Sequence, residues 1–493
     1  RAQDAPLRID RRVDVVHLAD EGRVRVGDGG DAHLVALVHL REVPLVHVHR
    51  EPHLGGLADD DERVGRADRL PDARVGNASD PPLPYGELAF RVMRPFCDLS
   101  DTTLRALIER AYATFRHPDI APTIAVGPFR VLELFHGPTL AFKDIALQFL
   151  GRLFDALLEE TGDRLNILAA TSGDTGSAAI HGVRGCRRIR IFVLHPRGRV
   201  SPLQERQMTS VLDPNVFNLA VEGTFDDCQR IVKAIFRDIA FKRERRLGAV
   251  NSVNWARVLA QMVYYFHSGL ATLRATGADR VRLAVPTGNF GDIFAGYLAA
   301  RMGLPVERLI LATNENDILA RFFATGEYRA SAVTPTLSPS MDIQVASNFE
   351  RYLFYRFDRD PERVRTAMEA FERDGRLNAP DAARDPLIAA GRADTEQTLA
   401  AIRETWRRHG YLLDPHTAVG VAVAQRAGMG ESPLICLATA HPAKFPEAIR
   451  RAIGEDRARH DLLEALKDAP TRMERIPAEV GRVRDFIASR TQD

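Results

Sequence analysis

The sequence predicts an α/β protein built on parallel strands, because two patterns recur along the chain. Short apolar runs end in polar or glycine-rich turns, and a helical pattern follows these turns. The runs occupy residues 166–170, 189–194, 281–285, 309–312 and 434–437. This alternation is typical of βαβ units whose sheet is covered by helices on both faces. Ligands in such folds bind beyond the carboxyl ends of the strands, which is where these polar turns fall.

Length and composition restrict the class of protein. A chain of 493 residues is long enough for two or three domains. Its hydrophobic content of 45% and charged content of 27% are ordinary for a globular protein, and a net charge of +1 favours neither a nucleic acid nor a membrane surface as partner. No apolar run could cross a bilayer, and no charged-then-apolar leader is visible. The four cysteines lie far apart, so we expect reduced thiols in a cytoplasmic protein.

Residues 1–84 differ from the rest of the chain. They contain no Phe, Trp, Lys, Thr, Met or Cys, but six of the fifteen histidines. Aromatic side chains normally dominate a packed core, so this segment would build a poor one. The histidines at 39, 47, 49 and 53 lack any supporting cysteine, and we predict no metal site. Our hypothesis is a wrong-frame or misassigned translation of GC-rich DNA; peptides from residues 10–75 in the native protein's mass spectrum would contradict it.

Ordinary elements begin after this segment. Apolar residues recur at helical spacing within residues 103–117, and Asp101 and Thr102 are the expected caps of that helix. Residues 129–135 alternate like a strand and lead to the turn that carries Lys143.

Lys143 is singled out by composition and by position. It is the first of only five lysines in a chain whose other basic residues are arginines. A guanidinium stays protonated, whereas a desolvated lysine amine can form an imine. Gly137-Pro138 indicates a turn before a helical apolar pattern, so Lys143 is expected near a helix start, where the positive helix end favours the neutral amine. Taken alone, a lysine beside Asp144 is also compatible with a surface position.

Two glycine-containing turns are candidate anion sites. Residues 288–292, Gly-Asn-Phe-Gly-Asp, combine closely approachable backbone amides with a following helix N-terminus. They match neither GxGxxG nor a Walker loop, which favours a single phosphate over a dinucleotide. Residues 172–176, Ser-Gly-Asp-Thr-Gly, suit a carboxylate or phosphate oxygen for the same reasons. Each segment alone is equally compatible with a tight turn or a capped helix that binds nothing.

Two further segments complete the candidates. Residues 251–257, Asn-Ser-Val-Asn-Trp-Ala-Arg, offer the amide, hydroxyl and guanidinium donors that a phosphate needs. Alone, they are also compatible with a helix cap followed by a solvated arginine. Thr439 follows the run at 434–437, where most threonines are structural.

Taken together, these segments resemble the threonine synthases, pyridoxal-phosphate enzymes of the tryptophan-synthase-β fold type. The resemblance runs from about residue 85 to about residue 460. It rests on six motifs that occur in family order: HGPTLAFKD at 136–144, TSGDTGSAA at 171–179, PRGRVSPLQ at 196–204, NSVNWAR at 251–257, PTGNFGD at 286–292 and TAHPAKF at 439–445. It implies two three-layer parallel-sheet domains with the cofactor in the cleft between them. The family's usual Tyr-x-Ser-Thr-Arg-Gly strand and small N-terminal domain are absent from residues 1–84.

The resemblance also implies the site residues. Lys143 falls on the family's Schiff-base lysine and proton shuttle. The implied cofactor-binding residues are Lys143, Asp174, Gly288, Asn289, Phe290, Gly291, Asp292 and Thr439. The implied substrate-binding residues are Ser172, Thr175, Asn251, Ser252 and Arg257. Relatives often carry Asn at the position of Asp174, and a carboxylate, unlike an amide, only accepts hydrogen bonds unless it is protonated.

The implied reaction converts O-phospho-L-homoserine and water into L-threonine and phosphate, with pyridoxal 5′-phosphate as cofactor. Two alternatives stay open: another lyase of the same fold, such as a serine or threonine dehydratase, and a non-catalytic relative that binds the cofactor. The donor-rich segment 251–257 argues against the dehydratase. The expected domains are residues 1–84 (atypical), 85–465 (catalytic, two α/β subdomains) and 466–493 (a helical tail), in a monomer or homodimer.

Overall fold

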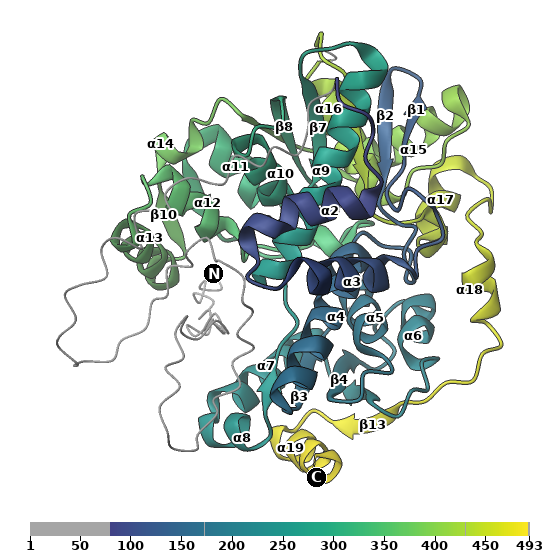
Figure 1. Cartoon of the computed structure of the whole chain (residues 1–493), viewed down its shortest axis with the longest axis vertical. Helices are drawn as coiled ribbons and strands as arrows, with labels where there is room; N and C mark the ends of the chain where they lie inside the picture. The colour runs from purple at the N-terminus through teal and green to yellow at the C-terminus, as the bar shows by residue number, and fades with distance from the viewer. Residues whose placement is uncertain (1–78, 172, 429, 492–493) are drawn as a thin grey trace, which may run out of the picture.

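The protein contains two parallel sheets joined by long helices (Figure 1). The computed structural model describes residues 79–171, 173–428 and 430–491. In Figure 1 the larger sheet lies in the upper half of the molecule and the smaller one in the lower half. The α/β class and the parallel strands predicted from the sequence are confirmed.

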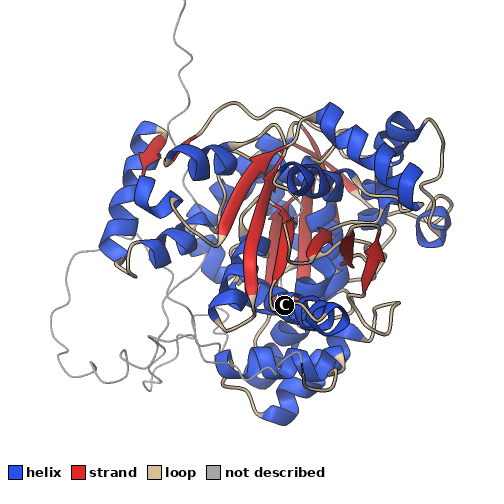
Figure 2. Cartoon of the chain, turned by 90° about the horizontal axis from the view of Figure 1, so that it is seen from above, coloured by secondary structure: helices blue, strands red, loops and turns tan. Residues whose placement is uncertain are grey.

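The larger sheet has six strands in the order β1-β2-β12-β7-β8-β11. These are β1 (Thr123–Val126), β2 (Phe129–Glu133), β12 (Leu434–Ala438), β7 (Val281–Pro286), β8 (Val306–Thr313) and β11 (Ile388–Arg392). Only β1 and β2 pair antiparallel within this sheet. The strands expected near 129–135, 281–285, 309–312 and 434–437 are all present, and Figure 2 shows helices on both sides of the strands.

The smaller sheet has five parallel strands in the order β13-β5-β4-β3-β6. These are β13 (Glu474–Pro477), β5 (Val216–Glu222), β4 (Ile189–Pro196), β3 (Leu165–Ala170) and β6 (Leu247–Gly248). The strands expected at 166–170 and 189–194 are confirmed as β3 and β4. The tail after residue 465 differs from the helical expectation, because β13 precedes its helix α19 (Val480–Arg490) and extends this sheet. A four-residue strand with a single buried side chain, Ile476, carries too little periodicity to be predicted.

One of these long helices contacts helices of both halves of the molecule. Helix α4 (Lys143–Thr161) packs against α5 (Asp174–Val183) of the smaller domain and α9 (Trp255–Thr276) of the larger one. The contact with α5 is close because glycines line it: a Cβ on Gly182 would lie 2.5 Å from the carbonyl oxygen of Leu147. The first residue of α4 therefore lies where the two domains meet.

The helix expected within residues 103–117 is α3 (Asp101–Tyr112), which follows α2 (Tyr85–Met93). The expected caps, Asp101 and Thr102, are wrong. Ser100 is the N-cap, with an extended backbone and a side chain that accepts a hydrogen bond from the Thr103 amide. Asp101 already has helical geometry, so it lies one position too late to cap.

The rest of the larger domain consists of helices and one small sheet. The helices nearest the site are α10 (Gly291–Arg301), α16 (Pro415–Arg426) and α12 (Phe349–Arg356). Strands β9 (Glu327–Arg329) and β10 (Arg376–Asn378) form an antiparallel pair beside α13 (Pro361–Asp374). The segment between β9 and α12, residues 330–348, runs to the carboxyl end of the larger sheet. Among the described residues, no helix has the length and apolar character that a bilayer crossing requires.

Candidate active site

Lys143 is the first residue of α4, as predicted. The turn before it is held against the end of β12 by backbone hydrogen bonds. Phe142 donates to the carbonyl of Thr439 at 2.8 Å, and His441 donates to the carbonyl of Leu140 at 3.0 Å. The lysine is thus fixed at the carboxyl edge of the larger sheet, and Thr439 lies directly beside its turn.

The Lys143 side chain is buried and faces two polar groups. Its Nζ lies 3.2 Å from Ser340 Oγ and 3.7 Å from Asp174 Oδ2. Burial lowers the pKa of the Lys143 amine; Asp174 opposes this shift, and the Lys444 and Arg257 cations add to it. The lowered pKa favours the neutral form of the Lys143 amine, as the sequence analysis predicted.

Asp174 begins α5 and is the centre of a buried polar cluster. Its Oδ1 lies 2.7 Å from Lys444 Nζ and accepts a hydrogen bond from Gln204 Nε2 at 2.8 Å. Its Oδ2 accepts a hydrogen bond from Ser340 Oγ at 3.2 Å. Burial alone would raise the pKa of Asp174, but Lys444 and Lys143 outweigh burial and hold the pKa below its usual range. The side chain is therefore a carboxylate that only accepts hydrogen bonds.

Ser340 links this cluster to the larger domain. Its backbone amide donates to His416 Nε2 at 3.2 Å, and His416 Nδ1 lies 2.9 Å from Asp414 Oδ1. Because Nε2 accepts, Nδ1 carries the proton and donates to the carboxylate. Thr417 connects the same network to Thr439, whose amide donates to the Thr417 hydroxyl at 3.2 Å.

The predicted phosphate loop joins β7 to α10. Gly288 lies against the 338–342 segment: a Cβ on it would be 2.7 Å from the carbonyl oxygen of Ser340. Phe290 is the N-cap of α10 and has a positive φ of 63°, so the amides at the helix start remain available to an anion. Asn289 accepts a hydrogen bond from Ser347 through Oδ1, at 3.4 Å. The loop therefore lies beside Lys143, with Ser340 between them.

Two side chains of this loop point into the protein interior. Phe290 packs among aromatic rings, including Phe349 and Tyr352. Asp292 accepts hydrogen bonds from the hydroxyls of Tyr264 and Tyr265, at 2.5 and 2.8 Å, and burial raises its pKa to about 6. Phe290 and Asp292 can therefore serve an anion through their backbone, while their side chains anchor the loop.

The 251–257 segment leads into α9 and is tied to the phosphate loop. Ser252 Oγ lies 2.7 Å from Ser347 Oγ, and the side-chain amide of Asn348 donates to the carbonyls of both Ser252 and Asn289. Asn251 accepts from the amide of Val253, which shapes the turn. These contacts bring the two predicted donor segments together.

Arg257 lies on the first turn of α9 and is 5% exposed. Its Nε has no hydrogen-bond partner among the described residues. Burial lowers the pKa of its guanidinium to about 10, so the group stays charged at neutral pH. A buried cation with an unsatisfied donor, close enough to affect the Lys143 amine, is a feature of an anion site.

The structure therefore brings most of the sequence-predicted residues into one region. Lys143, Asp174, Thr439 and the 288–292 loop surround Ser340 and the Lys143 turn, and Arg257 lies near them. Thr175 follows Asp174 at the start of α5. Ser172 lies outside the described residues, as do the histidines of residues 1–78.

Four residues of this cluster were not predicted: Gln204, Ser340, His416 and Lys444. Lys444 carried a signal, because it too is one of only five lysines in an arginine-rich chain. Gln204 and Lys444 also fall in motifs that carried the family resemblance. Ser340 lies within residues 338–342, which the resemblance also covers, whereas His416 had no comparable signal.

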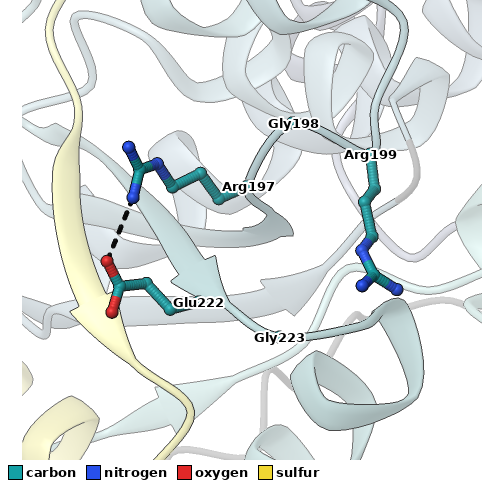
Figure 3. A pocket seen from close by; sticks show the side chains of 5 residues that line it. All are labelled: Arg197, Gly198, Arg199, Glu222 and Gly223. Carbon is teal, nitrogen blue, oxygen red and sulfur yellow. Dashed lines mark hydrogen bonds and ion pairs between the residues drawn. The ribbon is translucent and has the colours of Figure 1, made fainter.

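A separate surface pocket of about 450 Å³ lies beside the β4–α6 connection (Figure 3). Helix α6 spans Pro202–Thr209. Arg197 and Glu222 form an ion pair across the pocket at 3.1 Å, and Arg199 points away from that pair. It contains none of the predicted site residues, so we assign the chemistry to the Lys143 cluster.

Asp144 positions the Lys143 turn, and its replacement tests this role. It accepts hydrogen bonds from the amide and hydroxyl of Thr139, both at 2.7 Å, and burial raises its pKa to about 6. Asp144→Ala leaves the buried Thr139 amide unpaired, so we expect a loss of about 1–3 kcal/mol in unfolding free energy at pH 7.5. Asp144→Asn should lose much less, because one amide oxygen can accept from the Thr139 amide while the NH₂ donates to its hydroxyl. Equal losses in urea unfolding of both variants would contradict the assignment.

Gly288→Ala tests the close approach of the phosphate loop to Ser340. The new methyl group would meet backbone, which cannot rotate away, so one of the two segments must shift. We expect a loss of about 1–3 kcal/mol in unfolding free energy and about a 10- to 100-fold fall in turnover, because Ser340 contacts Lys143. Gly481→Ala is the matched control, since its Cβ would enter open space on α19. Wild-type turnover in Gly288→Ala would show that the approach is unimportant.

Comparisons with known proteins agree with this geometry. Residues 116–383 match the family "Pyridoxal-phosphate dependent enzyme", and residues 417–487 match "Threonine synthase, C-terminal". The chain is 50% identical over 417 residues to a threonine synthase of Pseudomonas aeruginosa, covering 82% of this chain and 88% of that protein. It is 45% identical over 446 residues to one of Schizosaccharomyces pombe, covering 82% and 86%.

Solved structures give the same result. The structure is similar to a PLP-bound threonine synthase from Brucella melitensis, with a TM-score of 0.80 and 45% identity, covering 83% of this chain and 89% of that one. It is similar to the yeast threonine synthase with a TM-score of 0.81 and 40% identity, covering 86% and 91%. The fold, the buried lysine at the domain junction and these likenesses lead to one conclusion: the chain belongs to the threonine synthase family of pyridoxal-phosphate-dependent enzymes.

Proposed function

We propose that this protein converts O-phospho-L-homoserine and water into L-threonine and phosphate. In this reaction phosphate leaves Cγ of the substrate and water adds at Cβ. The observation that carries the proposal is the buried Arg257, whose charge lowers the pKa of the Lys143 amine and whose Nε has no hydrogen-bond partner among the described residues, because such a guanidinium suits a phosphorylated substrate. A dehydratase of the same fold has no need for such a group, since its substrates carry no phosphate.

The residues at the site fit pyridoxal 5′-phosphate, the cofactor of this family. A lysine amine with a lowered pKa can hold the cofactor's aldehyde carbon, and the N-terminus of α10 with Gly288 suits its phosphate. When bound, the cofactor supplies an electron sink for negative charge developing on the substrate. We assign Gly288, Asn289, Phe290, Gly291 and the backbone of Asp292 to the cofactor phosphate.

Three of the remaining residues surround the cofactor ring and the substrate amino acid. We assign Thr439 to the ring nitrogen and Asp174 to the region of the ring oxygen. Thr175, at the N-terminus of α5, is assigned to the substrate carboxylate, where the helix end favours an anion.

Lys143 is the proton carrier in this proposal. Its neutral amine accepts the Cα proton of the substrate and later returns a proton to the product. The hydroxyl of Ser340 lies within hydrogen-bond distance and orients the amine. Asn251, Ser252 and Arg257 hold the substrate phosphate until it leaves, with Arg257 as the only cation among them.

The direct test is an assay of phosphate and threonine release from O-phospho-L-homoserine by the purified chain with added pyridoxal 5′-phosphate. We expect equal molar amounts of both products, and none of either from free homoserine. Release of ammonia and a keto acid from serine or threonine instead would favour the dehydratase. Cofactor binding without release of any product would favour a non-catalytic relative.

Three broader proposals accompany the reaction. The four cysteines are unpaired and buried, which supports a cytoplasmic location, where thiols stay reduced. We also propose a monomer or homodimer, which light scattering of the purified chain would distinguish from larger assemblies. Residues 85–465 are proposed as the catalytic region, with residues 466–493 as a tail that completes the smaller domain.

A further inference from the structure

Lys444 is a second buried lysine in the site, and the reaction proposed above gives it no role. It lies in a short 3-10 turn, Pro442–Lys444, that follows β12, and its side chain is fully buried. Its Nζ donates to the carbonyl of Thr139 at 2.9 Å and lies 2.7 Å from Asp174 Oδ1. It therefore ties the Lys143 turn of the larger domain to the first residue of α5 in the smaller one.

The two oxygens of Asp174 have different partners. Oδ1 faces Lys444 and Gln204, whereas Oδ2 faces Ser340 and Lys143. The ion-pair distance to Lys444 is 2.7 Å, and the distance to Lys143 is 3.7 Å. Asp174 is thus paired with Lys444 and only adjacent to Lys143.

This arrangement matters because a buried carboxylate needs a cation. Without Lys444, the nearest cation available to Asp174 is Lys143, and a closer pair would hold the Lys143 amine protonated. Two other groups reach the same pair from different elements. Arg257 on α9 is a cation that lowers the pKa of Lys143, whereas His416 on α16 reaches the pair through the Ser340 amide, from which its Nε2 accepts. Arg257 and Lys444 both disfavour a protonated Lys143, but of these two cations only Lys444 is shown in contact with the Asp174 carboxylate.

We propose that Lys444 is a positioning residue that neutralises Asp174 within a buried ion pair, so that Lys143 is left free to act as an amine. The pair makes the combined charge of the two side chains zero at the site. This inference rests on the proposed role of Lys143. It adds a requirement to that role: a cation other than Lys143 must neutralise the Asp174 carboxylate.

The test measures the ionisation of Lys143 directly. The cofactor-free full-length chain is labelled with acetic anhydride across a pH range, and acetylation of Lys143 is measured by peptide mass spectrometry. In Lys444→Met we expect the midpoint of Lys143 labelling to rise by about one pH unit or more, which is about a tenfold loss of labelling below the midpoint. The acid limb of the pH profile of kcat/KM in the cofactor-loaded enzyme should also move to higher pH.

A double variant separates charge from structure. In Asp174→Asn with Lys444→Met, both charges are absent, so the labelling midpoint should return close to the wild-type value. Lys444→Arg keeps the cation and should shift the midpoint less than Lys444→Met does. Lys467→Met is the matched control, because Lys467 is exposed and pairs with Glu464.

Each outcome decides for or against the inference. An unchanged midpoint in a folded Lys444→Met variant would overturn it. If Lys444→Met fails to fold, judged by circular dichroism, a folded double variant supports the inference. Failure of both to fold would overturn it, because the contact with Thr139 would then be the essential one. The labelling needs no substrate, so an inactive wild-type enzyme with the expected shift contradicts the proposed reaction alone.

Discussion

Lys143→Ala should abolish turnover while the fold stays intact. The amine, at the start of α4, contacts both Ser340 and Asp174, and in the proposed reaction it holds the cofactor and carries protons. We expect turnover to fall by at least about 10³-fold, because a lost general base typically costs about 10²–10⁴-fold and the covalent attachment point of the cofactor is lost as well. Phosphate release is the measurement, with circular dichroism to confirm the fold.

Removing this lysine should change the free energy of unfolding little. The wild-type protein buries the amine in a site where burial already disfavours its charged form. Lys467→Ala, at an exposed position, serves as the control and should keep full activity. Full activity in Lys143→Ala would reject the assigned role, whereas loss of the folded spectrum would show that the lysine is structural.

Arg257→Ala should raise KM for O-phospho-L-homoserine far more than it changes the affinity for pyridoxal 5′-phosphate. The guanidinium is the charged donor of the 251–257 segment, and its Nε has no hydrogen-bond partner among the residues that the structure describes. Loss of a buried charge-assisted contact to a phosphate costs about 2 kcal/mol or more, which is about 30-fold in KM. Steady-state kinetics and a spectroscopic cofactor titration measure the two quantities separately.

Two controls accompany the Arg257 variant. Arg257→Lys keeps the charge but loses the planar fork of donors, so its KM should lie between those of the wild type and Arg257→Ala. Arg199→Ala, in the surface pocket, should leave both quantities unchanged. An equal loss of cofactor and substrate affinity in Arg257→Ala would reassign this arginine to the cofactor.

The position of the site follows from how α4 joins the domains. Its first residue is anchored to β12 of the larger sheet, and its body packs against α5 of the smaller domain. Lys444 connects the Lys143 turn and α5 a second time, through Thr139 and Asp174.

The sequence by itself determined the local elements and singled out Lys143 as the candidate reactive lysine. Strand–turn–helix alternation predicted the βαβ units, because apolar periodicity reports which residues of one segment are buried. The turn at 137–138 and the apolar pattern after it placed Lys143 at a helix start, and α4 begins there. The rarity of lysine in this chain singled out that residue without any structure.

Only the tertiary structure decided which side chains surround Lys143. Ser340 is 197 residues from Lys143 in the chain, and Lys444 is 305 residues from Thr139. The side chains of Phe290 and Asp292 point into the core, and the sequence of a glycine-rich turn could not predict these directions either. The physical reason is that periodicity describes one segment at a time, whereas these contacts depend on where parallel strands meet after long crossover connections.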